Sequence, residues 1–179
     1  MTLRSLVTWL GLAAMAAPAF VPTVSGSEVR AAEEQRQDAQ FFARQYRPLL
    51  RRDSLRLTDE LAYLIVQAAD RHGIEHRVAF GMIWTESRFK VDALGKVGDV
   101  GLVQVLPSTA RKVCGIRSVR KLYEPATNLD CGFGYYAQML ERYSEVHWLA
   151  LVAYNRGPRI ADRIKAQGLG YPEHILAAR

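Results

Sequence analysis

Apolar residues recur three and four positions apart along most of the chain, the spacing of one face of an α-helix. One such helix begins at Leu57-Thr58-Asp59, where Thr58 or Asp59 can act as N-cap, and ends at His72-Gly73. The next runs from about Arg77 to the stretch around Glu86, with Phe89 on the same side. The remaining predicted helical segments are Pro107 to Val113, Val119 to Leu122, Cys131 to Tyr143 with a cap near Asn128, Leu149 to Tyr154, Pro158 to about Gln167, and a weakly held tail from Tyr171.

The pattern changes between Phe89 and Pro107. Several Gly and Asp residues interrupt any helix there and predict a turn-rich loop with room for a small β-hairpin. A short apolar run from Leu102 to Leu106 follows, and it contains Gln104, which is either a hydrogen-bonded core amide or a donor to a substrate. We therefore predict a mostly α-helical fold with many short helices and one small hairpin.

The first 26 residues have the pattern of an export signal: Arg4, an apolar run from Leu6 to Ala17, then small residues. Cleavage after Ala19 or Gly26 fits this pattern, and the run is short for a membrane span. An uncleaved anchor is the alternative. Residues 27–56 predict a helical extension or tether, interrupted by Pro48. Residues 57–179 then form the main domain. We expect an exported protein of the periplasm or cell envelope, with no membrane span after signal removal.

The chain of 179 residues carries a formal net charge of +6, which indicates either a solvated basic surface that keeps the protein soluble or an anionic partner such as nucleic acid, a membrane surface or a cell-wall polymer. No nucleic-acid-binding motif is present, so nucleic acid ranks last among these. The two cysteines, Cys114 and Cys131, form a disulfide in an oxidising compartment or remain buried free thiols. We find no Gly-rich phosphate loop and too few clustered Cys and His residues for a metal site, and we expect no cofactor. The sequence does not indicate the oligomeric state.

Glu86 is the candidate catalytic residue. It follows Met82 and Ile83 at helical spacing and so falls on an apolar stripe. Burying an ionised carboxylate there is costly, so the carboxyl must be paired, hydrogen-bonded or have a raised pKa. A carboxyl that stays protonated near neutral pH is what a general acid requires. The alternative is a carboxylate at a fraying helix end that points into water.

Four motifs together resemble the soluble lytic transglycosylase family, whose domain is goose-lysozyme-like and cleaves peptidoglycan. The motifs are Glu86-Ser87-Arg88-Phe89, Gly101-Leu102-Val103-Gln104 before Pro107-Ser108-Thr109, Asn128 with Gly132 and Tyr135, and Ala153-Tyr154-Asn155 with Gly157. The resemblance covers about Leu57 to Lys165. Three positions depart from it: Val103 stands where the family has Met, Asp99 where it often has Ala, and Gly95 where some members have Ser.

The resemblance implies a lysozyme-like fold and a lytic transglycosylase that forms a 1,6-anhydro product, with Glu86 as acid and then base. It places Ser87, Gln104, Val105, Tyr154 and Asn155 as candidate substrate-binding residues, each with a structural alternative. Two other functions stay open. One is a hydrolytic muramidase, if Asp99 supplies a second carboxylate across a water-sized gap. The other is a non-catalytic cell-wall-binding or secretion-assembly component, and an envelope-spanning assembly is a candidate partner.

Overall fold

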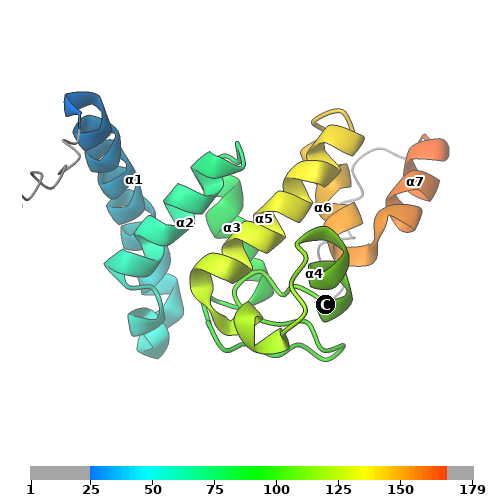
Figure 1. Cartoon of the computed structure of the whole chain (residues 1–179), viewed down its shortest axis with the longest axis horizontal. Coiled ribbons are helices and arrows are strands. Elements are labelled where there is room, and N and C mark those ends of the chain that lie inside the picture. The colour runs from blue at the N-terminus through cyan, green and yellow to red at the C-terminus, as the bar shows by residue number, and fades with distance from the viewer. Residues whose placement is uncertain (1–24, 169–179) are drawn as a thin grey trace, which may run out of the picture.

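The computed structural model describes residues 25–168, and within them it is mostly α-helical, as predicted (Figure 1). Its helices are α1 (Gly26–Leu50), α2 (Asp59–Arg71), α3 (His76–Glu86), α4 (Pro107–Val113), α5 (Pro125–Arg142), α6 (His147–Arg156) and α7 (Pro158–Ala166), with short 3-10 helices η1 (Arg51–Arg56) and η2 (Val119–Tyr123). Most of the export signal and the tail from Tyr171 lie outside the described residues. Within 25–168, no helix is both long and apolar enough to cross a membrane.

Helix α5 runs through the middle of the molecule and contacts α2 on one side and α6 on the other (Figure 1). Its buried face carries Leu129, Phe133 and Tyr136. The predicted start near Cys131 with a cap from Asn128 was wrong, because the helix begins at Pro125. Proline suits the first helical turn, where its missing N–H costs nothing. Asn128 therefore lies inside the helix, and its side chain is free for tertiary contacts.

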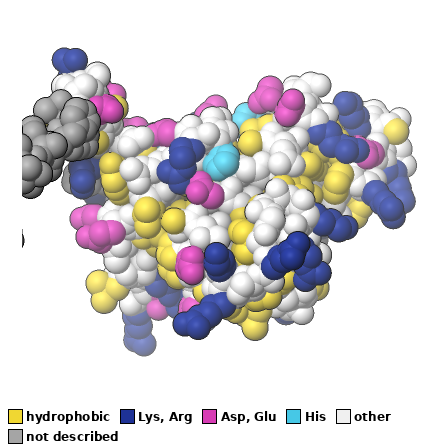
Figure 2. Space-filling model, viewed as in Figure 1, with side chains coloured by type: hydrophobic (Ala, Val, Ile, Leu, Met, Phe, Trp, Pro, Cys, Tyr) yellow, Lys and Arg dark blue, Asp and Glu magenta, His cyan; other side chains and the backbone are white. Residues whose placement is uncertain are grey.

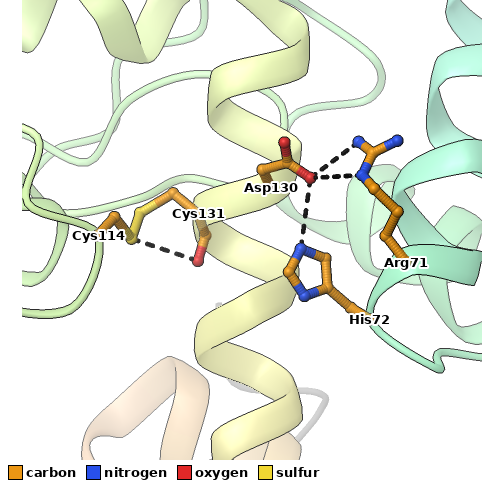
Figure 3. A network of polar contacts seen from close by, with 5 residues as sticks. All are labelled: Arg71, His72, Cys114, Asp130 and Cys131. Atoms are coloured by element: carbon orange, nitrogen blue, oxygen red, sulfur yellow. Dashed lines mark hydrogen bonds and ion pairs between the residues drawn. A yellow bond between two sulfur atoms is a disulfide. The ribbon is translucent and has the colours of Figure 1, made fainter.

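Two neighbouring residues of α5 tie this helix to its surroundings (Figure 3). Asp130 accepts hydrogen bonds from the guanidinium of Arg71, at 2.8 Å from Nη2, and its Oδ1 lies 3.3 Å from Nε2 of His72. Cys131 forms a disulfide with Cys114, just after α4, which confirms the disulfide reading over free thiols. Closing a loop of this length stabilises the fold by about 3 kcal/mol in the chain-entropy model.

Among the described residues, no cluster of acidic, His or Cys side chains could hold a metal ion.

Residues 26–56 pack against the rest of the core. Helix α1 buries Ala39 and Ala43, and Phe42 stacks on Phe80 of α3 with ring centroids 4.9 Å apart. The prediction that Pro48 interrupts this helix after Arg47 was wrong, because the helix continues to Leu50. Proline removes a backbone donor but lies here in the last turn, where few intrahelical bonds remain to be lost. Helix α1 therefore contacts both α2 and α3.

Between α3 and α4 the chain forms the predicted turn-rich loop. Arg88 and Phe89 adopt positive φ angles of 54° and 59°, which reverse the chain directly after the helix. Phe89 is fully buried, as predicted, but through this reversal and not by continuing the helix. The small hairpin is reduced to two isolated antiparallel bridges, Leu94 with Val100 and Val100 with Val105.

Candidate active site

Glu86 is the last residue of α3 and is half-buried. It lies close enough to Tyr154, near the end of α6, for the two side chains to interact electrostatically. Burial raises the pKa of the Tyr154 hydroxyl well above its usual range, and the negative charge of Glu86 adds to this. The fold thus brings together the predicted acid and an aromatic hydroxyl from 68 residues further along the chain.

The hydroxyl of Tyr154 is oriented by the loop. It donates a hydrogen bond of 2.6 Å to the backbone carbonyl of Val103. Helix α5 makes room for this pair at Gly132, where a Cβ atom would lie 2.2 Å from Cγ2 of Val103 and 2.9 Å from the Tyr154 oxygen. Only glycine allows so close an approach. Helices α3, α5 and α6 and the loop therefore converge beside Glu86.

Asn128 holds the same loop from the other side. This side chain is 1% exposed, and its Oδ1 accepts a hydrogen bond of 3.0 Å from the Val103 N–H. Its Nδ2 donates to the carbonyls of Val100 and Leu122, at 2.8 Å and 2.9 Å. Sequence reasoning treated Asn128 as a helix cap and missed this role. Its place in the motif with Gly132 was the only available signal.

The two loop residues predicted to bind substrate, Gln104 and Val105, form hydrogen bonds within the loop itself. Gln104 has a positive φ of 49°, and its side-chain amide donates to the carbonyl of Gly101 at 2.9 Å. Val105 is buried, and its backbone N–H and carbonyl both pair with Val100 at 3.0 Å. These contacts favour the structural alternative for both residues. Contact of either one with substrate stays a prediction.

The two predicted residues at helix ends also make local hydrogen bonds. The hydroxyl of Ser87 donates to the carbonyl of Ile83 at 3.3 Å, which is the structural alternative for this residue. Asn155 is exposed, and its Nδ2 donates to the carbonyl of Leu151 at 3.0 Å within the last turn of α6. A contact of Asn155 with substrate is compatible with its exposure and stays a prediction.

Two of the departures from the family pattern, Gly95 and Asp99, lie against each other. A Cβ atom at Gly95 would lie 2.0 Å from Oδ2 of Asp99, so the Asp99 carboxylate fills the space of a side chain at position 95. The backbone supports this arrangement, because the Gly95 N–H donates to the Asp99 carbonyl at 2.8 Å. A serine at position 95 would therefore require the Asp99 side chain to move from the position that it has in this loop.

Residues 63–171, more than half of the chain, match the family model described as the transglycosylase SLT domain. The chain belongs to the transglycosylase SLT domain family. It is 32% identical over 135 residues to a membrane-bound lytic murein transglycosylase C of Haemophilus influenzae, and this match covers 63% of the chain and 38% of the relative. It is 30% identical over 109 residues to a transglycosylase of Enterobacteria phage PRD1, covering 61% of the chain and 39% of that protein. The chain thus spans well under half the length of these relatives.

A solved structure has the same fold as this SLT domain. It is an inactive mutant of the lytic transglycosylase Slt from Pseudomonas aeruginosa in which one Glu is replaced by Gln. The match has a TM-score of 0.53 and 30% sequence identity, and it covers 56% of this chain and 17% of that one. The predicted lysozyme-like, mostly helical fold is thereby confirmed.

Replacing Tyr154 by Phe tests the hydrogen bond that orients the SLT domain loop. We expect Tyr154→Phe to lower the free energy of unfolding by about 1 kcal/mol at neutral pH, because the buried carbonyl of Val103 loses its donor. Folding raises the pKa of the Tyr154 phenol above its unfolded-state value of about 10. The stabilising contribution of the neutral phenol is therefore complete below pH 10, and it is lost as the pH rises through the folded-state pKa. The variant should therefore lose less stability than the wild type between neutral and strongly alkaline pH. Urea unfolding at both pH values measures this, and equal losses would contradict it.

Proposed function

We propose that this chain is a peptidoglycan lytic transglycosylase that cleaves the β-1,4 bond between MurNAc and GlcNAc, with Glu86 as its catalytic residue. The observation that carries the proposal is a half-buried carboxyl at the end of α3, beside Tyr154 and the Val103 loop. Membership in the SLT family supports the reaction type. The related Slt structure is named as an inactive mutant with a Glu-to-Gln substitution, and this supports an essential glutamate.

The proposed reaction needs only one carboxyl group. Glycosidases that hydrolyse their substrate normally use two. Here Glu86 donates its proton to the glycosidic oxygen as the bond from that oxygen to C1 of MurNAc breaks. The N-acetyl oxygen of the substrate stabilises the positive charge at C1. Glu86, now ionised, takes the proton from the C6 hydroxyl, whose oxygen bonds to C1, so the 1,6-anhydro ring forms without water.

The surroundings of Glu86 suit a group that must both give and take a proton. Tyr154 has one hydroxyl proton and donates it to Val103, so this proton does not neutralise the Glu86 carboxylate. The raised pKa keeps Tyr154 uncharged over the whole physiological range. Glu86 is therefore the titratable group of this pair that exchanges protons with substrate.

Mass spectrometry of the products tests the proposal. Purified protein is incubated with isolated peptidoglycan, and the released muropeptides are compared with those from a hydrolytic muramidase. We expect products lighter by one water, because the C6 hydroxyl and not a water molecule closes the reaction. Products with ordinary reducing ends would instead identify a hydrolase, and Asp99 would become the candidate base. A lack of any product would favour a non-catalytic wall-binding or assembly component.

We also propose that the protein works outside the cytoplasm, in the periplasm or cell envelope, where peptidoglycan is accessible. The export-signal pattern of residues 1–26 supports this, as does the disulfide. In this proposal residues 27–56 are a helical extension, residues 57–179 are the catalytic domain, and an envelope-spanning assembly is a candidate partner. N-terminal sequencing of exported protein tests the cleavage site. Cleavage after Ala19 would retain Ser25, the N-cap of α1, and cleavage after Gly26 would remove it.

A further inference from the structure

Residues 111–121 form an unusually basic part of the surface, which we call the basic segment. It carries Arg111, Lys112, Arg117, Arg120 and Lys121, and the chain has no Asp or Glu from residue 100 to residue 123. All five basic side chains are exposed. Figure 2 shows Lys and Arg side chains gathered over the part of the surface where α4 lies in Figure 1. This one segment therefore contributes five positive charges to a chain whose net charge is +6.

The positive charges of the basic segment are not balanced within the described part of the chain. None of the five side chains forms an ion pair with a carboxylate there. Helix α1, in contrast, interleaves its arginines with Glu28, Glu33, Glu34 and Asp38. Like charges held close together repel one another, so an uncompensated cluster is best satisfied by an external anion.

The basic segment is also held in place at both ends. The disulfide from Cys114 to Cys131 fixes it to α5, and the Ile116 N–H donates to the Ala110 carbonyl at 3.1 Å. At its far end Leu122 is buried, and its carbonyl accepts the hydrogen bond from Asn128. Because the chain here is anchored, the positive charges are presented as a preformed surface.

Asn128 links the basic segment to the candidate active site. Its side chain bonds Leu122 at the end of the segment and also bonds Val103, whose carbonyl accepts the Tyr154 hydroxyl. At the other end, α4 begins directly after the loop and has seven residues, which rise by about 10 Å. The basic segment is therefore joined at both of its ends to the loop beside the candidate active site.

We infer that the basic segment binds the carboxylates of the peptide stems on peptidoglycan, so that the protein favours strands that carry stems. The inference rests on the proposed function and names the charged part of the same substrate. The stems fit because each strand presents their free carboxylates repeatedly, and these carboxylates complement the five exposed positive charges. A bilayer surface fits less well, because Val119 is the only large apolar residue of the segment that is prominently exposed.

The test is the binding of sacculi by full-length protein carrying Glu86→Gln, so that no turnover is needed. Arg117→Gln, Arg120→Gln and Lys121→Gln are combined in one variant. The matched control combines Arg30→Gln, Arg44→Gln and Arg52→Gln, three exposed cations of α1 and η1. Both are compared on untreated sacculi and on sacculi whose carboxyls have been converted to neutral amides with a carbodiimide and ethanolamine.

We expect the basic-segment variant to bind untreated sacculi about tenfold more weakly than its parent at low ionic strength. The difference should disappear at high salt and on amidated sacculi, and the control should change by less than about twofold. Equal weakening on both kinds of sacculi, or no weakening, would overturn the inference. Stronger segment-dependent binding to phosphatidylglycerol vesicles than to sacculi would overturn it in favour of a membrane. Binding is measured independently of cleavage. If the protein binds in this pattern but the wild type does not cleave peptidoglycan, only the proposed function is refuted.

Discussion

Replacing Glu86 by Gln is expected to lower the rate of glycan-strand cleavage by about 10²- to 10⁴-fold, the range attributed to general acid–base catalysis. The amide has nearly the same size as the carboxyl but can neither donate an acidic proton to the glycosidic oxygen nor accept one from the C6 hydroxyl. Both steps of the proposed reaction therefore fail together. The rate of release of soluble muropeptides from isolated peptidoglycan measures this.

The matched control for this substitution is Glu141→Gln, which makes the same change at an exposed position of α5. It should keep full activity. The Glu86→Gln variant should also keep its helical circular dichroism, because the amide has nearly the same size and shape as the carboxyl. Wild-type activity in the Glu86→Gln variant would show that another group is the catalyst.

Asn128→Ala is expected to lower the free energy of unfolding by about 3–4 kcal/mol, the largest loss of stability that we predict. The truncation removes all three hydrogen bonds of this buried amide and leaves the Val103 N–H and the Leu122 carbonyl without their partner. The Val100 carbonyl suffers less, because it also accepts from the Val105 N–H. Urea unfolding followed by circular dichroism measures the loss.

Two further variants show whether the geometry around Asn128 is responsible. Asn128→Asp keeps the acceptor for Val103 but loses the donors to two carbonyls and buries a charge, so it should be at least as destabilising as alanine. Gly101→Ala should perturb the hydrogen bonds of Asn128 from the loop side. The new Cβ would lie 2.4 Å from Nδ2 of Asn128, and the φ angle at position 101 is +82°. Exposed Gln138→Ala on the same helix should change the stability by less than about 0.5 kcal/mol. A comparable effect at Gln138 and Asn128 would refute the argument.

Elements with local signals were predictable from the sequence. Thr58 caps α2, Pro107 and Pro158 open α4 and α7, and Gly157 follows α6, each as its residue type indicates. These signals act between residues within a few positions of each other, so they do not depend on the rest of the fold. Errors arose where a local signal was overruled by packing. Pro48 lies inside α1 because the following turn still buries Leu50.

The sequence by itself determined the helical class of the protein, most helix starts and the candidate acid at the end of α3, and it left the two cysteines as either a disulfide or free thiols. Only the tertiary structure decided what surrounds that acid. Asn128 bonds a backbone group 25 residues away, and Tyr154 bonds one 51 residues away. Hydrophobic periodicity reports which face of a helix is buried and not which distant backbone group that face meets. A buried polar side chain is assigned its partner only when the whole core has been assembled, because only then must each buried hydrogen-bonding group be satisfied.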